Sequence, residues 1–109
     1  MSLKLFASVP MKDRTDEQIK QSLLNAKEKT ESILGEEVEL IDTFITEDMP
    51  EDASNPGVWY LGKSIELLSK ADIVFFSSEW RNYRGCVIEH MIAEKYDILQ
   101  IDESTKVVR

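Results

Sequence analysis

The chain has 109 residues, of which 42% are hydrophobic, and a formal net charge of −8. This length predicts a single domain over residues 1–109 with one hydrophobic core. No apolar run approaches the roughly 20 residues of a membrane helix and no signal peptide is recognisable, so we expect a cytoplasmic protein without a membrane partner. Residues 36–52 contain eight acids and no Lys or Arg. Such an acidic surface repels phosphate backbones, and we expect no polynucleotide partner.

The N-terminal third predicts a strand followed by a long helix. Leu3, Leu5 and Ala7 alternate with Lys4, Phe6 and Ser8, and Pro10 ends the run, which is typical of a strand. Thr15 and Gln18 have the spacing of a capping box, and apolar residues at helical spacing continue to Gly35. This pattern predicts a helix that begins at Thr15 and ends at the glycine.

A second strand, a long loop and a second helix are predicted next. Residues 38–41 form a short apolar run, and residues 43–57 carry acids and two prolines, which indicates a loop. Long ordered loops in small domains are usually binding segments or lids. Asn55 and Pro56 supply a cap and a first-turn residue for a helix that continues to about Ala71.

The C-terminal part predicts a buried strand, a loop, a helix and a last strand. Residues 73–76 are continuously apolar, as in a central parallel strand. A loop over residues 77–84 leads to a helix over residues 85–96, and residues 98–101 form the fourth strand.

The alternation of strands and helices predicts an α/β fold with a small doubly wound parallel sheet, flavodoxin-like or Rossmann-like. We expect the strand order 2-1-3-4. Ligands of such sheets bind beyond the carboxyl ends of the strands, at the switch point between the first and third strands. The glycine-rich motif of dinucleotide sites and the Walker lysine motif are both absent from the sequence.

Candidate reactive groups cluster at the start of the third helix. Glu89 lies four residues after Gly85, where the positive end of the helix dipole favours the ionised, nucleophilic carboxylate. Arg81 and Arg84 flank the same helix start and either hold a phosphate or carboxylate or pair with nearby acids such as Glu79.

Aromatic and thiol groups in the same run have alternative interpretations. Trp80 and Tyr83 either stack on a planar base or fill the edge of the core. Cys86 and His90 share one helical face, so a thiol nucleophile is a minor alternative to a buried cysteine. His90 and Glu94 have metal-ligand spacing, but a third ligand is lacking and we predict no metal site.

Several short motifs follow one another along the chain: 8–11, 15–17, 60–64, the apolar run 71–76, the run 80–89 and the Gly-x-x-x-Glu helix over residues 85–93. In these motifs the sequence resembles the nucleoside 2-deoxyribosyltransferase superfamily, above all its small bacterial and phage branch. The resemblance covers most of the chain. Fold membership does not by itself prove activity.

This resemblance implies roles for particular residues. Glu89 matches the catalytic glutamate, which attacks the anomeric carbon of the sugar and displaces the base. Ser64 occupies the place of the acid that protonates the base, so Asp42, Glu79 or an acid from a neighbouring subunit is the expected substitute. The family's first-strand loop usually contributes a tyrosine or small polar residues. The expected substrate-binding residues are Ser8, Pro10, Met11, Ser64, Trp80, Arg81, Asn82, Tyr83, Arg84 and Gly85.

The expected function is that of a nucleoside or nucleotide N-glycosyl hydrolase or transferase that acts on a 2-deoxyribosyl substrate through a covalent glycosyl-enzyme. It needs no metal and no organic cofactor. One alternative is a non-catalytic nucleotide-binding protein that has lost the acid, and another is a structural or partner-binding subunit. Because so short a chain leaves its site open, and because relatives of this kind share active sites between subunits, we expect a homo-oligomer.

Overall fold

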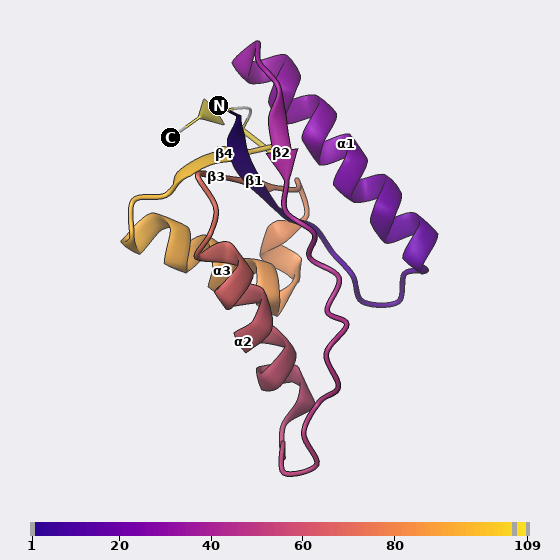
Figure 1. Ribbon diagram of the computed structural model, residues 1–109. Helices are drawn as coiled ribbons and strands as arrows, with labels where there is room; N and C mark the ends of the chain where they lie inside the picture. Colours follow the sequence, from indigo (N-terminus) through magenta and orange to yellow (C-terminus); the bar gives the residue numbers. More distant parts are fainter. Residues whose placement is uncertain (1, 106, 109) are drawn as a thin grey trace.

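A five-stranded sheet separates helix α1 from helices α2 and α3 in the computed structural model, which describes residues 2–105 and 107–108 (Figure 1). The strands are β1 (Leu3–Ser8), β2 (Val38–Leu40), β3 (Ile73–Phe76), β4 (Leu99–Asp102) and β5 (Val107–Val108). The helices are α1 (Asp16–Leu34), α2 (Pro56–Leu68), α3 (Arg84–Lys95) and the short 3₁₀ helix η1 (Trp80–Asn82).

The sheet has the order β2-β1-β3-β4-β5, and its first four strands are parallel. The predicted α/β class and the order 2-1-3-4 are therefore confirmed, and the fold is flavodoxin-like. The sequence did not predict β5, which pairs antiparallel with β4 through Ile101 and Val108. A strand is recognised in a sequence by alternation of apolar and polar residues over at least four positions, and a strand of two residues is too short to show it.

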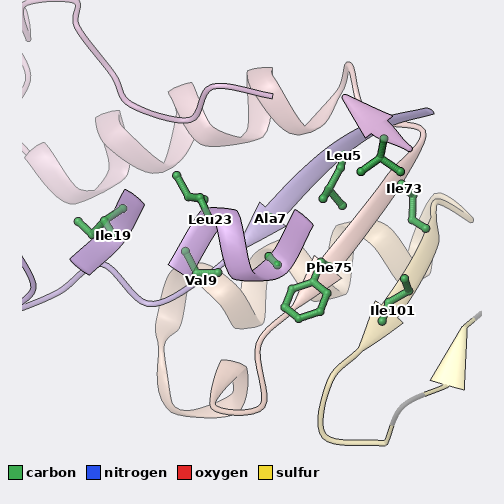
Figure 2. Packing of buried hydrophobic residues seen from close by; sticks show 10 residues of the cluster. Leu5, Ala7, Val9, Ile19, Leu23, Ile73, Phe75 and Ile101 are labelled. Carbon is green, nitrogen blue, oxygen red and sulfur yellow. The ribbon is translucent and has the colours of Figure 1, made fainter. Parts of the chain in front are cut away.

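The central strands β1 and β3 bury both of their faces. Leu5 and Phe75 face α1 and belong to the same hydrophobic cluster as Ile19 and Leu23 of that helix (Figure 2). Phe6 faces the other side of the sheet, in the cluster that α2 and α3 cover. Successive side chains of a strand point to opposite faces, so the continuous apolar run 73–76 supplies both cores.

The predicted starts of α1 and α2 and the predicted end of α1 are confirmed by their caps, whereas α2 ends at Leu68 and not near Ala71. The Thr15 side chain accepts a hydrogen bond from the Gln18 backbone N–H, and the Gln18 side chain accepts one from Thr15, which completes the capping box of α1. Gly35 ends α1 in the left-handed conformation with φ of 72°. The Asn55 side chain caps α2 by accepting from the Val58 backbone N–H.

The long segment between β2 and α2 crosses the carboxyl edge of the sheet. Thr43 is buried, and the partly buried Phe44 packs against the core under α1. Further along the segment, Glu47 forms an ion pair with Lys63 of α2 at 2.8 Å. The eight acids of residues 36–52 are all exposed, as expected for a solvated acidic segment. None of the helices in the described part combines the length and apolar character needed to cross a bilayer.

Candidate active site

A cleft of about 510 Å³ opens at the carboxyl end of β1, on the side of the sheet that α2 and α3 cover. Its walls come from the loop after β1, the start of α1, residues 43–45, one face of α2 and the first two turns of α3. It therefore lies at the switch point between β1 and β3, where the fold predicts a ligand site. Of the expected site residues, the cleft brings together Ser8, Met11, Ser64, Tyr83, Arg84, Gly85 and Glu89.

Glu89 lies at the base of this cleft and is only 6% exposed. The Ser8 hydroxyl, at the end of β1, donates a hydrogen bond of 2.7 Å to Glu89 Oε1. The Ser64 side chain, on α2, is a second hydrogen-bonding partner of the same carboxyl group. Side chains from β1 and α2 thus both contact the Glu89 carboxyl group of α3, and these contacts fix the position of that group in the cleft.

Burial raises the pKa of Glu89 to about 7, and the hydrogen bonds from Ser8 and Ser64 oppose part of this rise. Burial therefore outweighs the stabilisation of the ionised form that the helix dipole was expected to give. Glu89 is the sixth residue of α3, and the dipole acts mainly within the first turn. Desolvation of the carboxylate dominates instead, so the group changes its charge near neutral pH.

The two acids expected to assist Glu89 lie outside the cleft. Asp42 is exposed, and its carboxylate accepts a hydrogen bond from the backbone N–H of Phe44 at 3.0 Å. Glu79 is also exposed and pairs with Arg14 at 3.3 Å. Asp16, at the first turn of α1, is the other carboxyl group among the residues that line the cleft. The resemblance had placed Asp16 in a motif without assigning it a role.

Comparison with models of known protein families, with curated proteins and with solved structures finds no match. The site is therefore interpreted from its own geometry and chemistry.

Trp80 and Arg81 also lie outside the cleft. Trp80 is 8% exposed, stacks on His90 with ring centroids 3.8 Å apart, and donates its indole N–H to Asp102 at 3.2 Å. Arg81 lies over the Trp80 ring at 4.5 Å and approaches Asp102 at 3.9 Å. The buried alternative for Trp80 is thus the one observed, and the arginines that flank α3 point to different sites.

Two other expected residues lie beside the cleft without lining it. Pro10 is buried and borders a small hollow on the α1 side of the sheet. Asn82 lines a hollow that adjoins the cleft, together with Tyr83 and Arg84. The first-strand loop therefore contributes Ser8 and Met11 to the cleft itself.

Thr43 and Tyr60 line the cleft and were missed as site residues. The Thr43 hydroxyl is buried and has no hydrogen-bond partner among the described residues. Its position after β2, at the carboxyl edge of the sheet, was the available signal. Tyr60 belongs to a motif that the resemblance quoted, and it supplies from α2 a tyrosine that the first-strand loop does not.

The cysteine and histidine do not form a thiol active site. Cys86 is 4% exposed, and burial raises the pKa of its thiol, so the thiolate is disfavoured. The His90 ring packs between Trp80 and Phe76 instead. Within the part of the chain that the structure describes, no three His, Cys, Asp or Glu residues are grouped to hold a metal ion.

Proposed function

We propose that the protein is an N-glycosyl hydrolase or transferase that acts on a 2-deoxyribosyl nucleoside or nucleotide through Glu89. The observation that carries this proposal is a buried carboxyl group at the base of an open cleft, held by the Ser8 hydroxyl at 2.7 Å. Strongly perturbed carboxyl groups in clefts are concentrated at functional sites. The cleft also has aromatic walls, Tyr60 and Tyr83, which suit a planar base.

In the proposed reaction, the ionised Glu89 carboxylate attacks the anomeric carbon of the sugar. A C–O bond to Glu89 forms as the N-glycosidic bond breaks, and the base leaves with the electron pair of that bond. Water or a second base then attacks the same carbon, which releases Glu89 and gives the sugar net retention of configuration. Ser8 orients the attacking oxygen through its hydrogen bond.

The departing base must gain a proton. Asp42 and Glu79 lie elsewhere, and Ser64 is not acidic enough. Asp16 lines the cleft but is exposed at the start of α1, so we infer that water at the open mouth of the cleft supplies the proton. Without a positioned acid the reaction loses about 10²- to 10⁴-fold in rate. We therefore expect slow turnover, and the covalent intermediate is the better quantity to measure.

The second candidate is a nucleotide-binding protein without catalysis. Two hydroxyl groups contact Glu89 and its pKa lies near neutrality, so the carboxyl group is also suited to hydrogen-bond a bound sugar. This alternative requires the same cleft and differs from the first only in the absence of bond breaking.

Intact-mass measurement with 2-fluoro-arabino nucleosides and their 5′-phosphates tests the proposal. The fluorine slows breakdown of the glycosyl-enzyme, so we expect a mass increase of one fluorosugar on the wild type. Glu89→Ala should abolish it, because the attacking oxygen is gone. Glu94→Ala, which removes an exposed carboxylate from the same helix, should leave the adduct unchanged.

Failure of every purine and pyrimidine analogue to label the wild type, with the corresponding substrates unconsumed, would overturn catalysis. Thermal stabilisation by the same compounds without labelling would then identify the binding protein. An adduct that persists in Glu89→Ala would show that another residue is the nucleophile.

Gly85→Ala should weaken ligand binding without weakening the fold. A Cβ at Gly85 would meet no atom within 4 Å, and the residue lines the cleft, so the methyl group would occupy the space of the ligand. Stability should stay unchanged or rise by up to about 1 kcal/mol, as expected for Gly→Ala in a helix. Labelling rate and urea unfolding together measure the two effects.

Gly62→Ala is the matched control, because a Cβ at Gly62 also meets no atom within 4 Å and this residue of α2 does not line the cleft. Equal labelling rates in the wild type and both variants would contradict a substrate position against the first turn of α3.

A further inference from the structure

A second hollow, of about 850 Å³, adjoins the cleft between α1 and the start of α3. Lys12, Tyr83 and Arg84 line both spaces, so the two spaces lie side by side at these three side chains. The lining of the second hollow is polar, with amide and hydroxyl groups from α1 such as Gln18 and Ser22. The two spaces therefore differ in chemistry, and the second is suited to a charged, hydrated group.

Three cationic side chains line this second hollow: Lys12, Arg14 and Arg84. Asp13 lines the hollow with them and Glu79 pairs with Arg14, which leaves an excess of one positive charge in a chain of net charge −8. Lys12 and Arg84 are exposed and form no ion pair with any carboxylate in the described part of the chain. Positive charge is thus concentrated beside the cleft, which attracts an anion to it.

Arg14 is held by an ion pair. One guanidinium nitrogen donates to Glu79 at 3.3 Å. A guanidinium has five N–H donors, so further donors remain, and Glu79 itself does not line the hollow. Arg14 therefore presents free donors to the hollow that Tyr83 and Arg84 also line.

The N-terminus of α3 adds backbone donors where the two spaces lie side by side. Arg84 is the first residue of this 12-residue helix, and its N-cap residue, Tyr83, makes no side-chain hydrogen bond to the first turn. Free N–H groups at a helix start favour an anion. Together with the three cations they match the several oxygens of a phosphate, whereas a carboxylate would use fewer of them.

We propose that this second hollow binds the phosphate group of the substrate, so that the enzyme acts on a nucleotide and not on a free nucleoside. Lys12, Arg14 and Arg84 hold the phosphate while the sugar lies over Glu89 in the cleft. This inference rests on the proposed function for the identity of the sugar. The sequence had suggested Arg81 and Arg84 as the residues that bind an anion. Because Arg81 contacts Asp102 and Ser104 instead, we assign Lys12 and Arg14 as the partners of Arg84 in phosphate binding.

Binding of 2-deoxyribose 5-phosphate, compared with 2-deoxyribose, tests the subsite by calorimetry in the Glu89→Gln background, where no covalent step occurs. We expect the phosphate to increase affinity at least about tenfold and to make binding weaken with salt, as charge-assisted contacts do. The double variant Lys12→Gln/Arg84→Gln should remove this gain. Both residues are exposed, so the fold should tolerate the changes.

Arg81→Gln is the matched control, because it removes an exposed arginine near the same helix start that lies outside both spaces. Equal affinity for the two sugars, or equal losses in the double variant and the control, would overturn the subsite. A salt-sensitive increase in affinity for the phosphorylated sugar that depends on Lys12 and Arg84 supports the subsite. If no fluorosugar adduct forms in that case, only the catalytic proposal fails. Labelling of nucleosides and their 5′-phosphates at equal rates would overturn the subsite and leave the chemistry intact.

Discussion

Glu89→Gln should make the protein more stable than the wild type by about 3 kcal/mol at pH 8, and no more stable at pH 4. The wild-type pKa rises from 4.5 to about 7 on folding, and one pKa unit corresponds to about 1.4 kcal/mol. The side chain is buried, so little solvent screening reduces this value. A glutamine is neutral at every pH and still offers an oxygen to the Ser8 hydroxyl.

The sign follows from where the proton binds. A carboxyl group whose pKa is higher in the folded state binds its proton more tightly there than in the unfolded chain. The neutral form of Glu89 therefore contributes stability that is fully present below pH 4.5 and is gone once the pH exceeds about 7. The difference in unfolding free energy between Glu89→Gln and the wild type should therefore grow from pH 4.5 to about pH 7 and stay constant at higher pH.

Urea unfolding at pH 4, 6 and 8 measures the difference. Glu94→Gln is the control, because it neutralises an exposed glutamate of the same helix and should change stability little at any pH. A Glu89→Gln difference that is equal at all three pH values would contradict an ionisation that is coupled to folding.

This cost agrees with the proposed role of Glu89. A core residue selected for stability alone would not be a carboxyl group that loses its proton near neutral pH. Retention of Glu89 at the base of a cleft, where it destabilises the fold at neutral pH, is the pattern expected when stability is exchanged for activity.

The fold was predictable because its signals are local. The start and end of α1 are indicated by the Thr15–Gln18 capping box and by Gly35. The buried strand β3 is indicated by the apolar run 73–76. The parallel order then follows from the alternation of helices and strands. The antiparallel strand β5 depends on pairing with Ile101 and Asp102, and nothing within its two residues indicates such a partner.

The site was predictable in position but not in electrostatics. Glu89 was identified from its spacing to Gly85, whereas its pKa depends on burial and on Ser8, which lies 81 residues away in sequence. The directions of Arg81 and Arg84 also differ although the two residues are three apart, because η1 turns Arg81 toward Asp102 while Arg84 begins α3. Contacts of this kind come from tertiary packing, and no local pattern contains them.

Trp80→Ala should destabilise the protein by about 3–5 kcal/mol, as large-to-small changes of buried aromatic residues do. The indole packs on His90 and near Phe76 and donates to Asp102, so truncation leaves a cavity under η1. Trp80→Phe keeps a ring in this position and loses only the N–H donor. Because Asp102 still accepts from the Ser104 backbone N–H and hydroxyl, we expect a loss of about 1 kcal/mol.

The pair of variants separates a packing role from base recognition. Trp80 packs among Phe76, His90 and Asp102 and does not line the cleft, so Trp80→Phe should bind 2-deoxyribose 5-phosphate and form the fluorosugar adduct like the wild type. Urea unfolding, calorimetry and intact mass on the same preparations give the three readouts. A Trp80→Phe variant of wild-type stability that labels tenfold more slowly with nucleotides would instead place the indole against the base. Retained labelling with lowered stability would mean that Trp80 stabilises the packing of η1 and does not contact the substrate.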